Sequence, residues 1–233
     1  MNLAILDIDG TLTDTSHVDQ LCYTRAVAET HGVIEIGASW TNCPHVSDSG
    51  ITRQIFLDHF GREPIDEDLS PLKTRFFDLL REHHELDAAA FAEIPGARRM
   101  VTHLSQHDDW VITIATGCWH GSAKLKLAAA GIEVEQFPGG FAEDDHAREG
   151  IVQAAIDRAR RHYGHPEFNK IVSVGDGLWD LRTAANLDLD FVGIASGERA
   201  QVLNQAGARH IVGDYLDLNN FFDFLNLAER PLK

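Results

Sequence analysis

The sequence predicts an α/β protein built on a doubly wound, mainly parallel sheet, because short apolar runs alternate with longer helical patterns. The apolar runs have the length and composition of buried strands and lie at residues 3–6, 110–115, 171–174 and 191–194. Helical patterns lie at residues 96–106, 119–130, 147–163 and 180–186. Two of these helical patterns end at a glycine, Gly131 and Gly164. A sheet covered by helices on both faces follows from this alternation.

A long interval separates the first two predicted strands, far more chain than one crossover helix requires. Helices are expected in this interval at residues 16–31, 49–60 and 71–85. A turn signal at residues 94–96, Ile-Pro-Gly, marks the return of the chain to the sheet. We therefore predict an α/β core of residues 1–14 and 94–233, and an inserted small α-helical cap domain of residues 15–93.

The composition argues against several classes of partner. The chain has 36 acidic and 20 basic residues, and its net charge of −16 repels nucleic acid and anionic membranes. We expect no membrane span and no signal peptide, because no apolar stretch approaches roughly 18 residues and the first residues lack a basic segment. The three cysteines, Cys22, Cys43 and Cys118, form no CxxC pair, which favours a reducing compartment. The prediction is a cytoplasmic protein, with the oligomeric state left open.

Carboxylates follow two of the predicted strands. Asp7 and Asp9 come directly after the first strand, and Asp176 and Asp180 come after the strand at 171–174. Ligands bind at the carboxyl ends of the strands in open α/β sheets, so these acids are expected to face one site. Such carboxylates suit Mg²⁺, which prefers hard oxygen ligands. The competing interpretation is that the first pair opens a turn and that Asp180 is a solvated acid in the first turn of a helix.

Candidate phosphate-binding groups follow the strand at 110–115 and open a later helix. Thr116 and Gly117 lie between a strand and a helix, where a hydroxyl and free backbone N–H groups can bind phosphate oxygens. A simple helix cap is the competing interpretation of Thr116. Arg148 opens a helical segment, where the helix dipole disfavours a cation, and such an exception can mark a functional residue. A surface arginine is the alternative.

Together these motifs resemble those of the haloacid dehalogenase superfamily, and the resemblance covers essentially the whole chain. It is greatest to phosphoglycolate phosphatase-like members, which have a Rossmann-like core and a helical cap. The resemblance implies that Asp7 is a nucleophile and Asp9 a general acid and base. It also implies that Thr116 binds the phosphoryl group. Mg²⁺ would be held by Asp7, Asp176, Asp180 and the backbone carbonyl of Asp9.

The chain departs from the superfamily pattern at the third motif, which most often contains a lysine. No lysine occurs between Lys126 and Lys170. Arg148 is the predicted substitute, because an arginine both neutralises phosphate and binds it bidentately. Asp9 favours phosphoryl chemistry, since the dehalogenases and phosphonatases that resemble this chain elsewhere usually lack a carboxylate there.

The resemblance implies an Mg²⁺-dependent phosphatase that hydrolyses a small phosphorylated metabolite, a phosphoglycolate-like phosphomonoester, through an aspartyl-phosphate intermediate. Two alternatives remain: a phosphomutase of the β-phosphoglucomutase type, and a non-catalytic metabolite-binding protein on the same fold. A polar, glycine-containing loop of the cap either sets substrate choice or is an ordinary surface loop. Its candidate residues are Trp40, His45, Ser47, Asp48, Ser49 and Arg53.

Overall fold

A computed structural model, which describes residues 1–34, 36 and 43–232, confirms the α/β fold class. Six strands form one sheet in the order β3-β2-β1-β4-β5-β6, and every neighbouring pair is parallel. The strands are β1 (Asn2–Leu6), β2 (Trp110–Ala115), β3 (Gly139–Gly140), β4 (Ile171–Gly175), β5 (Asp190–Ile194) and β6 (Ile211–Val212). Because the strand order reverses between β1 and β4, their carboxyl ends border the crevice where such sheets bind ligands.

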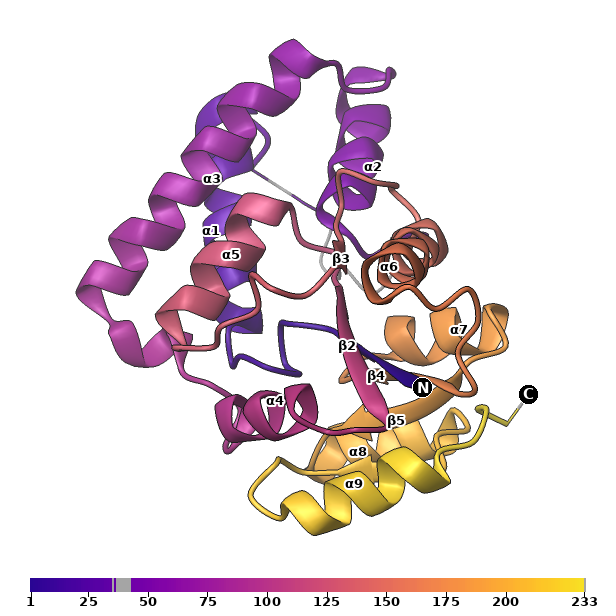
Figure 1. Ribbon diagram of the computed structural model, residues 1–233. Helices are drawn as coiled ribbons and strands as arrows, with labels where there is room; N and C mark the ends of the chain where they lie inside the picture. The colour runs from indigo at the N-terminus through magenta and orange to yellow at the C-terminus, as the bar shows by residue number, and fades with distance from the viewer. Residues whose placement is uncertain (35, 37–42, 233) are drawn as a thin grey trace.

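Helices of the core cover both faces of this sheet (Figure 1). They are α4 (Ala97–Ser105), α5 (His120–Ala129), α6 (Arg148–Tyr163), α7 (Leu178–Asn186), α8 (Gly197–Gln205) and α9 (Leu218–Leu227). Ala4 and Leu6 of β1 belong to the apolar cluster that α4, α5 and α9 complete. Leu3 and Ile5 belong to the opposite cluster, with α6, α7 and α8. This alternation along one strand is the period-two pattern of a sheet buried on both faces.

The insertion between β1 and β2 is helical. It contains α1 (Ser16–His31), α2 (Asp48–Phe60), α3 (Asp66–Leu86) and a short 3₁₀ helix (Ala88–Phe91). These helices lie together at the end of the molecule opposite α8 and α9 (Figure 1). Tyr23 and Phe76 of the insertion share a buried apolar cluster with Trp119, the residue that precedes core helix α5. Helices of the insertion therefore pack directly against α5.

Several details of the fold differ from the predicted elements, and helices α8 and α9 were not predicted. Helix α3 begins at Asp66, five residues before the predicted start at Pro71, because three acids in its first turn suit the helix dipole and Asp68 accepts the N–H of Ile65 at 2.9 Å. Strands β3 and β6 were not predicted, since each has two residues and leaves no periodic pattern. In the described residues, no helix combines the length and apolar character needed to cross a membrane.

Candidate active site

Three acids meet at the carboxyl ends of β1 and β4. Asp7 directly follows β1, and Asp176 directly follows β4. Asp180 lies in the first turn of α7, where its Oδ2 accepts the N–H of Gly177 at 3.1 Å. The three carboxylates are buried and place oxygens within 4.8 Å of one another. The fold thus assembles the acid cluster that the sequence pattern predicts.

The close approach of two loops in this cluster depends on Gly10. This residue has a φ of 77°, which L side chains rarely adopt. A Cβ atom at this position would clash with the carboxylate of Asp176. It would lie 2.9 Å from Oδ1 and closer still to Oδ2 and Cγ. A glycine is therefore required where the loop after β1 passes Asp176.

Burial and mutual repulsion shift the titration of these acids. Burial raises the pKa of Asp7 to about 7, and the nearby charge of Asp180 adds to this shift. Burial, followed by the charges of Asp180 and Asp7, raises the pKa of Asp176 well above its usual range. Within the described residues, Asp176 Oδ1 is buried and has no hydrogen-bond partner. Three crowded carboxylates with an unpartnered oxygen match the hard-oxygen ligand set of Mg²⁺, so these residues fit that ion.

Arg148 brings a positive charge into the same site. From the first residue of α6, its Nη1 donates to Asp180 Oδ1 at 2.8 Å and to Asp7 Oδ1 at 3.4 Å. Its Nε donates to the carbonyl of Val46 at 2.8 Å, and the side chain is 12% exposed. Although burial opposes the charged form, Asp180 and Asp7 raise the pKa of the guanidinium above its usual value. The structure places Arg148 where the resemblance requires a cation.

The loop after β2 meets Arg148 from the other side. Thr116 is buried, and its hydroxyl accepts the N–H of Cys118 at 3.3 Å. At Gly117, a Cβ atom would lie 3.0 Å from Arg148 Nη2 and 2.8 Å from the carbonyl of Val46. The absence of a side chain at Gly117 therefore lets the guanidinium lie against the loop that carries the candidate phosphate-binding groups.

Asp9 contacts a different set of partners. Its Oδ1 accepts from the hydroxyl of Thr15 at 2.5 Å, and its Oδ2 accepts from Cys118 Sγ at 2.8 Å and from Lys126 Nζ at 2.5 Å. Burial alone would raise the pKa of Asp9, but the ammonium of Lys126 and the hydrogen bonds outweigh burial and lower this pKa below its usual value. Asp9 is therefore an ionised carboxylate in this arrangement.

Residues of the predicted cap loop occupy different places. Ser47 and Asp48 are buried at the contact with the core: Ser47 Oγ donates to the carbonyl of His146 at 2.6 Å, and Asp48 Oδ2 accepts the N–H of Trp119 at 2.7 Å. The ring of His45 lies 4.9 Å from that of His146, edge to face.

The remaining candidates of the cap loop do not gather at the acids. Ser49 Oγ donates to the carbonyl of Ala142 at 2.6 Å. Arg53 is partly exposed and pairs with Glu63 at 2.5 Å. Trp40 falls outside the residues that the structure describes.

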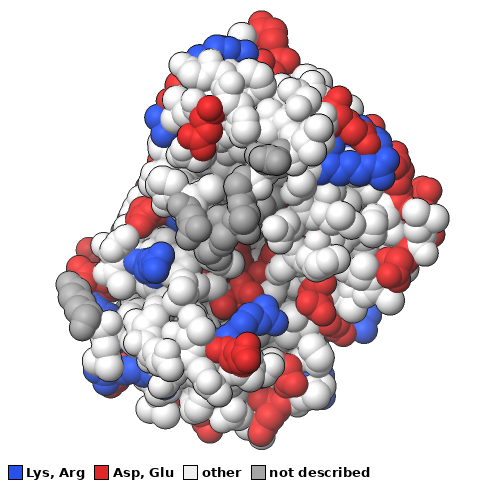
Figure 2. All heavy atoms as spheres, turned by 180° about the vertical axis from the view of Figure 1, so that it is seen from behind, with Lys and Arg blue, Asp and Glu red and all other residues white. Residues whose placement is uncertain are grey.

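A cavity of about 360 Å³ opens beside Arg148. Residues 43–46 of the insertion line one side, and Trp179 and Arg182 of α7 line the other. On the face opposite the view of Figure 1, acidic side chains lie at the floor of a recess (Figure 2). The cavity adjoins the acid site through Arg148, and none of Asp7, Asp176 and Asp180 lines it.

Sequence analysis missed several residues near the acids. Lys126 and Cys118 contact Asp9, although neither belongs to a recognisable short motif. Arg199 of α8 approaches Asp176 at 3.2 Å, and the buried hydroxyl of Tyr215 has no hydrogen-bond partner among the described residues. Arg199 and Tyr215 follow β5 and β6 within a few residues, and Lys126 lies in the helix after β2, but none of them belongs to a short motif, so only the folded chain reveals their place.

Comparison with known proteins assigns the family. The haloacid dehalogenase-like hydrolase family matches residues 1–188, so the chain belongs to this family of hydrolases. A search of curated proteins gives no match. Among solved structures, a hydrolase from Pseudomonas syringae is 22% identical, with a TM-score of 0.65 over 96% of this chain and 98% of that one.

Two further solved structures share the fold at lower identity. A HAD hydrolase, family IA, variant 3, from Entamoeba histolytica is 15% identical, with a TM-score of 0.66 over 97% of this chain and 100% of that one. A phosphonoacetaldehyde hydrolase-like protein from Oleispira antarctica is 18% identical, with a TM-score of 0.64 over 97% of this chain and 92% of that one. At these identities the structures support the fold alone.

Proposed function

We propose that the protein is an Mg²⁺-dependent phosphatase that hydrolyses a small phosphorylated metabolite through an aspartyl-phosphate on Asp7. The observation that carries this proposal is the position of the Arg148 guanidinium, which contacts Asp7 and Asp180 and lies against Gly117. An arginine there can bind the phosphate oxygens while a carboxylate attacks the phosphorus. The cavity beside Arg148 supports a small substrate, for which a phosphoglycolate-like phosphomonoester is our first candidate.

Two proton-coupled steps follow from the positions of Asp7 and Asp9. A carboxylate oxygen of Asp7 forms a bond to phosphorus while the bond from phosphorus to the ester oxygen breaks, and Asp9 protonates the departing alkoxide. Asp9 then takes a proton from water as the water oxygen attacks the phosphorus of the aspartyl-phosphate. Inorganic phosphate leaves, the carboxylate of Asp7 is restored, and Asp9 again carries a proton. The bound substrate phosphate, being negative, favours the protonated form of Asp9 that the first step needs.

Mg²⁺ would be held by Asp7, Asp176 and Asp180, with the backbone carbonyl of Asp9 as a further ligand. When bound, the ion supplies positive charge that offsets the phosphate and the crowded acids. Arg148 and the loop at Thr116 and Gly117 would orient the phosphoryl group. Segment 45–48 contacts the core through Ser47 and Asp48 and would limit the access of water to the site.

The proposal is tested by phosphate release from a panel of small phosphomonoesters, including phosphoglycolate and sugar phosphates, with Mg²⁺ or with EDTA. We expect release only with Mg²⁺, and near-complete loss in Asp7→Asn, whose amide is a poor nucleophile and metal ligand. The matched control is Asp14→Asn, an exposed acid in the same segment, which should retain activity. Substantial release by Asp7→Asn would refute the covalent mechanism.

The same panel distinguishes hydrolysis from the phosphomutase reaction, in which the phosphoryl group returns to the sugar. If a sugar phosphate is isomerised without release of inorganic phosphate, the protein is a phosphomutase of the β-phosphoglucomutase type. If no phosphate ester reacts and one of them binds, the protein is a metabolite-binding member of the family. A cytoplasmic location belongs to this proposal as well, and the three free cysteines support it.

A further inference from the structure

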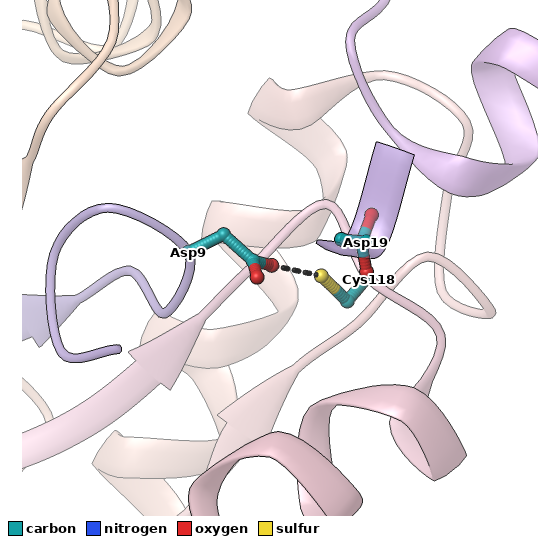
Figure 3. Close-up of side chains that lie close together, drawn as sticks. All are labelled: Asp9, Asp19 and Cys118. Carbon is teal, nitrogen blue, oxygen red and sulfur yellow. Dashed lines mark hydrogen bonds between the residues drawn. The ribbon is translucent and has the colours of Figure 1, made fainter. Parts of the chain in front are cut away.

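A second buried cluster lies beside the acid cluster. Asp9, Asp19 and Cys118 point toward one another from three parts of the chain: the loop after β1, cap helix α1, and the loop after β2 (Figure 3). Their ligating atoms lie within 4.8 Å of one another, which is a spacing that could hold a metal ion. The cluster therefore needs a source of positive charge.

Lys126 supplies that charge. Its Nζ donates to Asp9 Oδ2 at 2.5 Å, to Asp19 Oδ1 at 2.6 Å and to Cys118 Sγ at 3.0 Å. These contacts use all three donors of an ammonium group. The Lys126 side chain is fully buried, on a helix whose residues Ala123 and Leu127 belong to the apolar core. An ammonium already fills the position between the three ligating atoms, so this cluster is not a second metal site.

The lysine is held in its charged form. Two carboxylate oxygens lie close to its Nζ, 2.5 Å away for Asp9 Oδ2 and 2.6 Å away for Asp19 Oδ1, and their negative charges favour the ammonium form. A lysine that attacks a carbonyl carbon must be neutral and must reach its substrate. Lys126 meets neither condition, so it is not a nucleophile here.

Stability alone does not account for a fully buried ammonium at this place. A buried ion pair is often no more stabilising than well-packed apolar groups of similar size. The distinctive feature of Lys126 is what it joins: Asp9, which acts in the proposed reaction, and Asp19, which belongs to the cap. Thr15 holds the other oxygen of Asp9, so both oxygens of that carboxylate are fixed.

We propose that Lys126 is a positioning residue, whose ammonium fixes the carboxylate of Asp9 and, through Asp19, couples that position to cap helix α1. This inference rests on the proposed function, because that function gives Asp9 its part in the reaction. The seating of α1 then helps to determine where Asp9 presents its carboxyl group to the leaving oxygen.

The test compares two esters of similar size, phenyl phosphate and 4-nitrophenyl phosphate, in the full-length protein with Mg²⁺. Nitrophenolate leaves readily without a proton, whereas phenolate depends more on the general acid. In Lys126→Met, we expect kcat/KM to fall about tenfold more for the phenyl ester than for the nitrophenyl ester, because a displaced Asp9 is a poorer acid. Lys124→Met, an exposed lysine on the same helix, should leave the ratio of the two esters unchanged.

A loss of folded protein lowers both rates by one factor, so an unchanged ester ratio in Lys126→Met would overturn the proposal. If this variant does not fold, because Asp9 and Asp19 lose their cation, the ratio is measured in Lys126→Met/Asp19→Leu, which replaces the Lys126–Asp19 pair with apolar groups. The same change in ratio is expected there, and an unchanged ratio again overturns the proposal.

The coupling to the cap has a readout that needs no activity. Amide hydrogen exchange in residues 16–31 should be faster in Lys126→Met than in the unmodified protein, and Lys124→Met should match the unmodified protein. Unchanged exchange in Lys126→Met would refute the coupling. If the unmodified protein hydrolyses neither ester, the proposed function fails, while the exchange experiment still decides whether Lys126 and Asp19 hold α1.

Discussion

Replacing Gly10 with alanine should damage the metal site far more than it damages the fold. Gly10 has a φ of 77°, and an L residue in this left-handed region costs about 1–2 kcal/mol. Gly164, at the end of α6, has a nearly equal φ of 67°, and no atom lies within 4 Å of the position of its Cβ. Gly164→Ala therefore measures the backbone cost alone. Gly10→Ala adds the collision with the carboxylate of Asp176.

That collision should displace a metal ligand. Substitutions that disturb the orientation of ligands typically weaken metal binding about 10–100-fold, and we expect this range for Gly10→Ala. Urea denaturation gives the stability of both variants, and isothermal titration calorimetry gives their Mg²⁺ affinity. Gly164→Ala should bind Mg²⁺ as the unmodified protein does. Unaltered Mg²⁺ affinity in Gly10→Ala would show that Asp176 is not a ligand or that the loop after β1 adjusts freely.

Three further predictions concern the charges of the site. Arg148→Ala should lower kcat/KM for the best phosphomonoester about 100- to 1,000-fold, as expected for loss of a group that offsets transition-state charge. The control Arg158→Ala, on the same helix, should have little effect. Near-native kinetics in Arg148→Ala would refute the assignment of Arg148 to the phosphate site. Burial raises the pKa of Asp7 from its usual value of 3.8 to about 7, so the metal-free protein loses stability as the pH rises through this interval. Below pH 7, a proton on Asp7 also competes with Mg²⁺. Thermal denaturation should thus show that Mg²⁺ increases Tm more at pH ~8 than at pH ~6, and equal increases would contradict the raised pKa of Asp7. Arg199→Ala should change Mg²⁺ affinity by no more than about threefold in calorimetry, since solvent screens the charge of Arg199, whose side chain is 62% exposed although Asp176 is buried. A larger change would mean that Arg199 controls the site.

The fold was predictable where the sequence has strong local patterns. The buried strands β1, β2, β4 and β5 are short apolar runs, and their alternation with helices fixes a parallel sheet. The start of α3 was placed too late because Pro71 favours a first-turn position, while the acids before it stabilise an earlier turn. Strands β3 and β6 owe their pairing to neighbouring strands and not to their own two residues.

The site was predictable where the catalytic candidates follow strands in order along the chain. Asp7, Asp176 and Asp180 meet because parallel strands end at one edge of the sheet, and Arg148, chosen from its helix-start position and the resemblance, contacts Asp7 and Asp180. Lys126 could not be identified in this way. Its carboxylate partners, Asp9 and Asp19, are distant in sequence. A lysine between leucines on a helix ordinarily lies on the exposed face of that helix.

The central claim is that Asp7 forms a covalent bond to the phosphoryl group. An acyl phosphate reacts with hydroxylamine to give a hydroxamate and inorganic phosphate, so turnover in the presence of hydroxylamine should gradually modify the nucleophile. Peptide mapping by mass spectrometry then locates the modified carboxyl group. We expect a hydroxamate on Asp7 that requires both substrate and Mg²⁺. Continued turnover with Asp7 unmodified, or a hydroxamate on another acid, would contradict it.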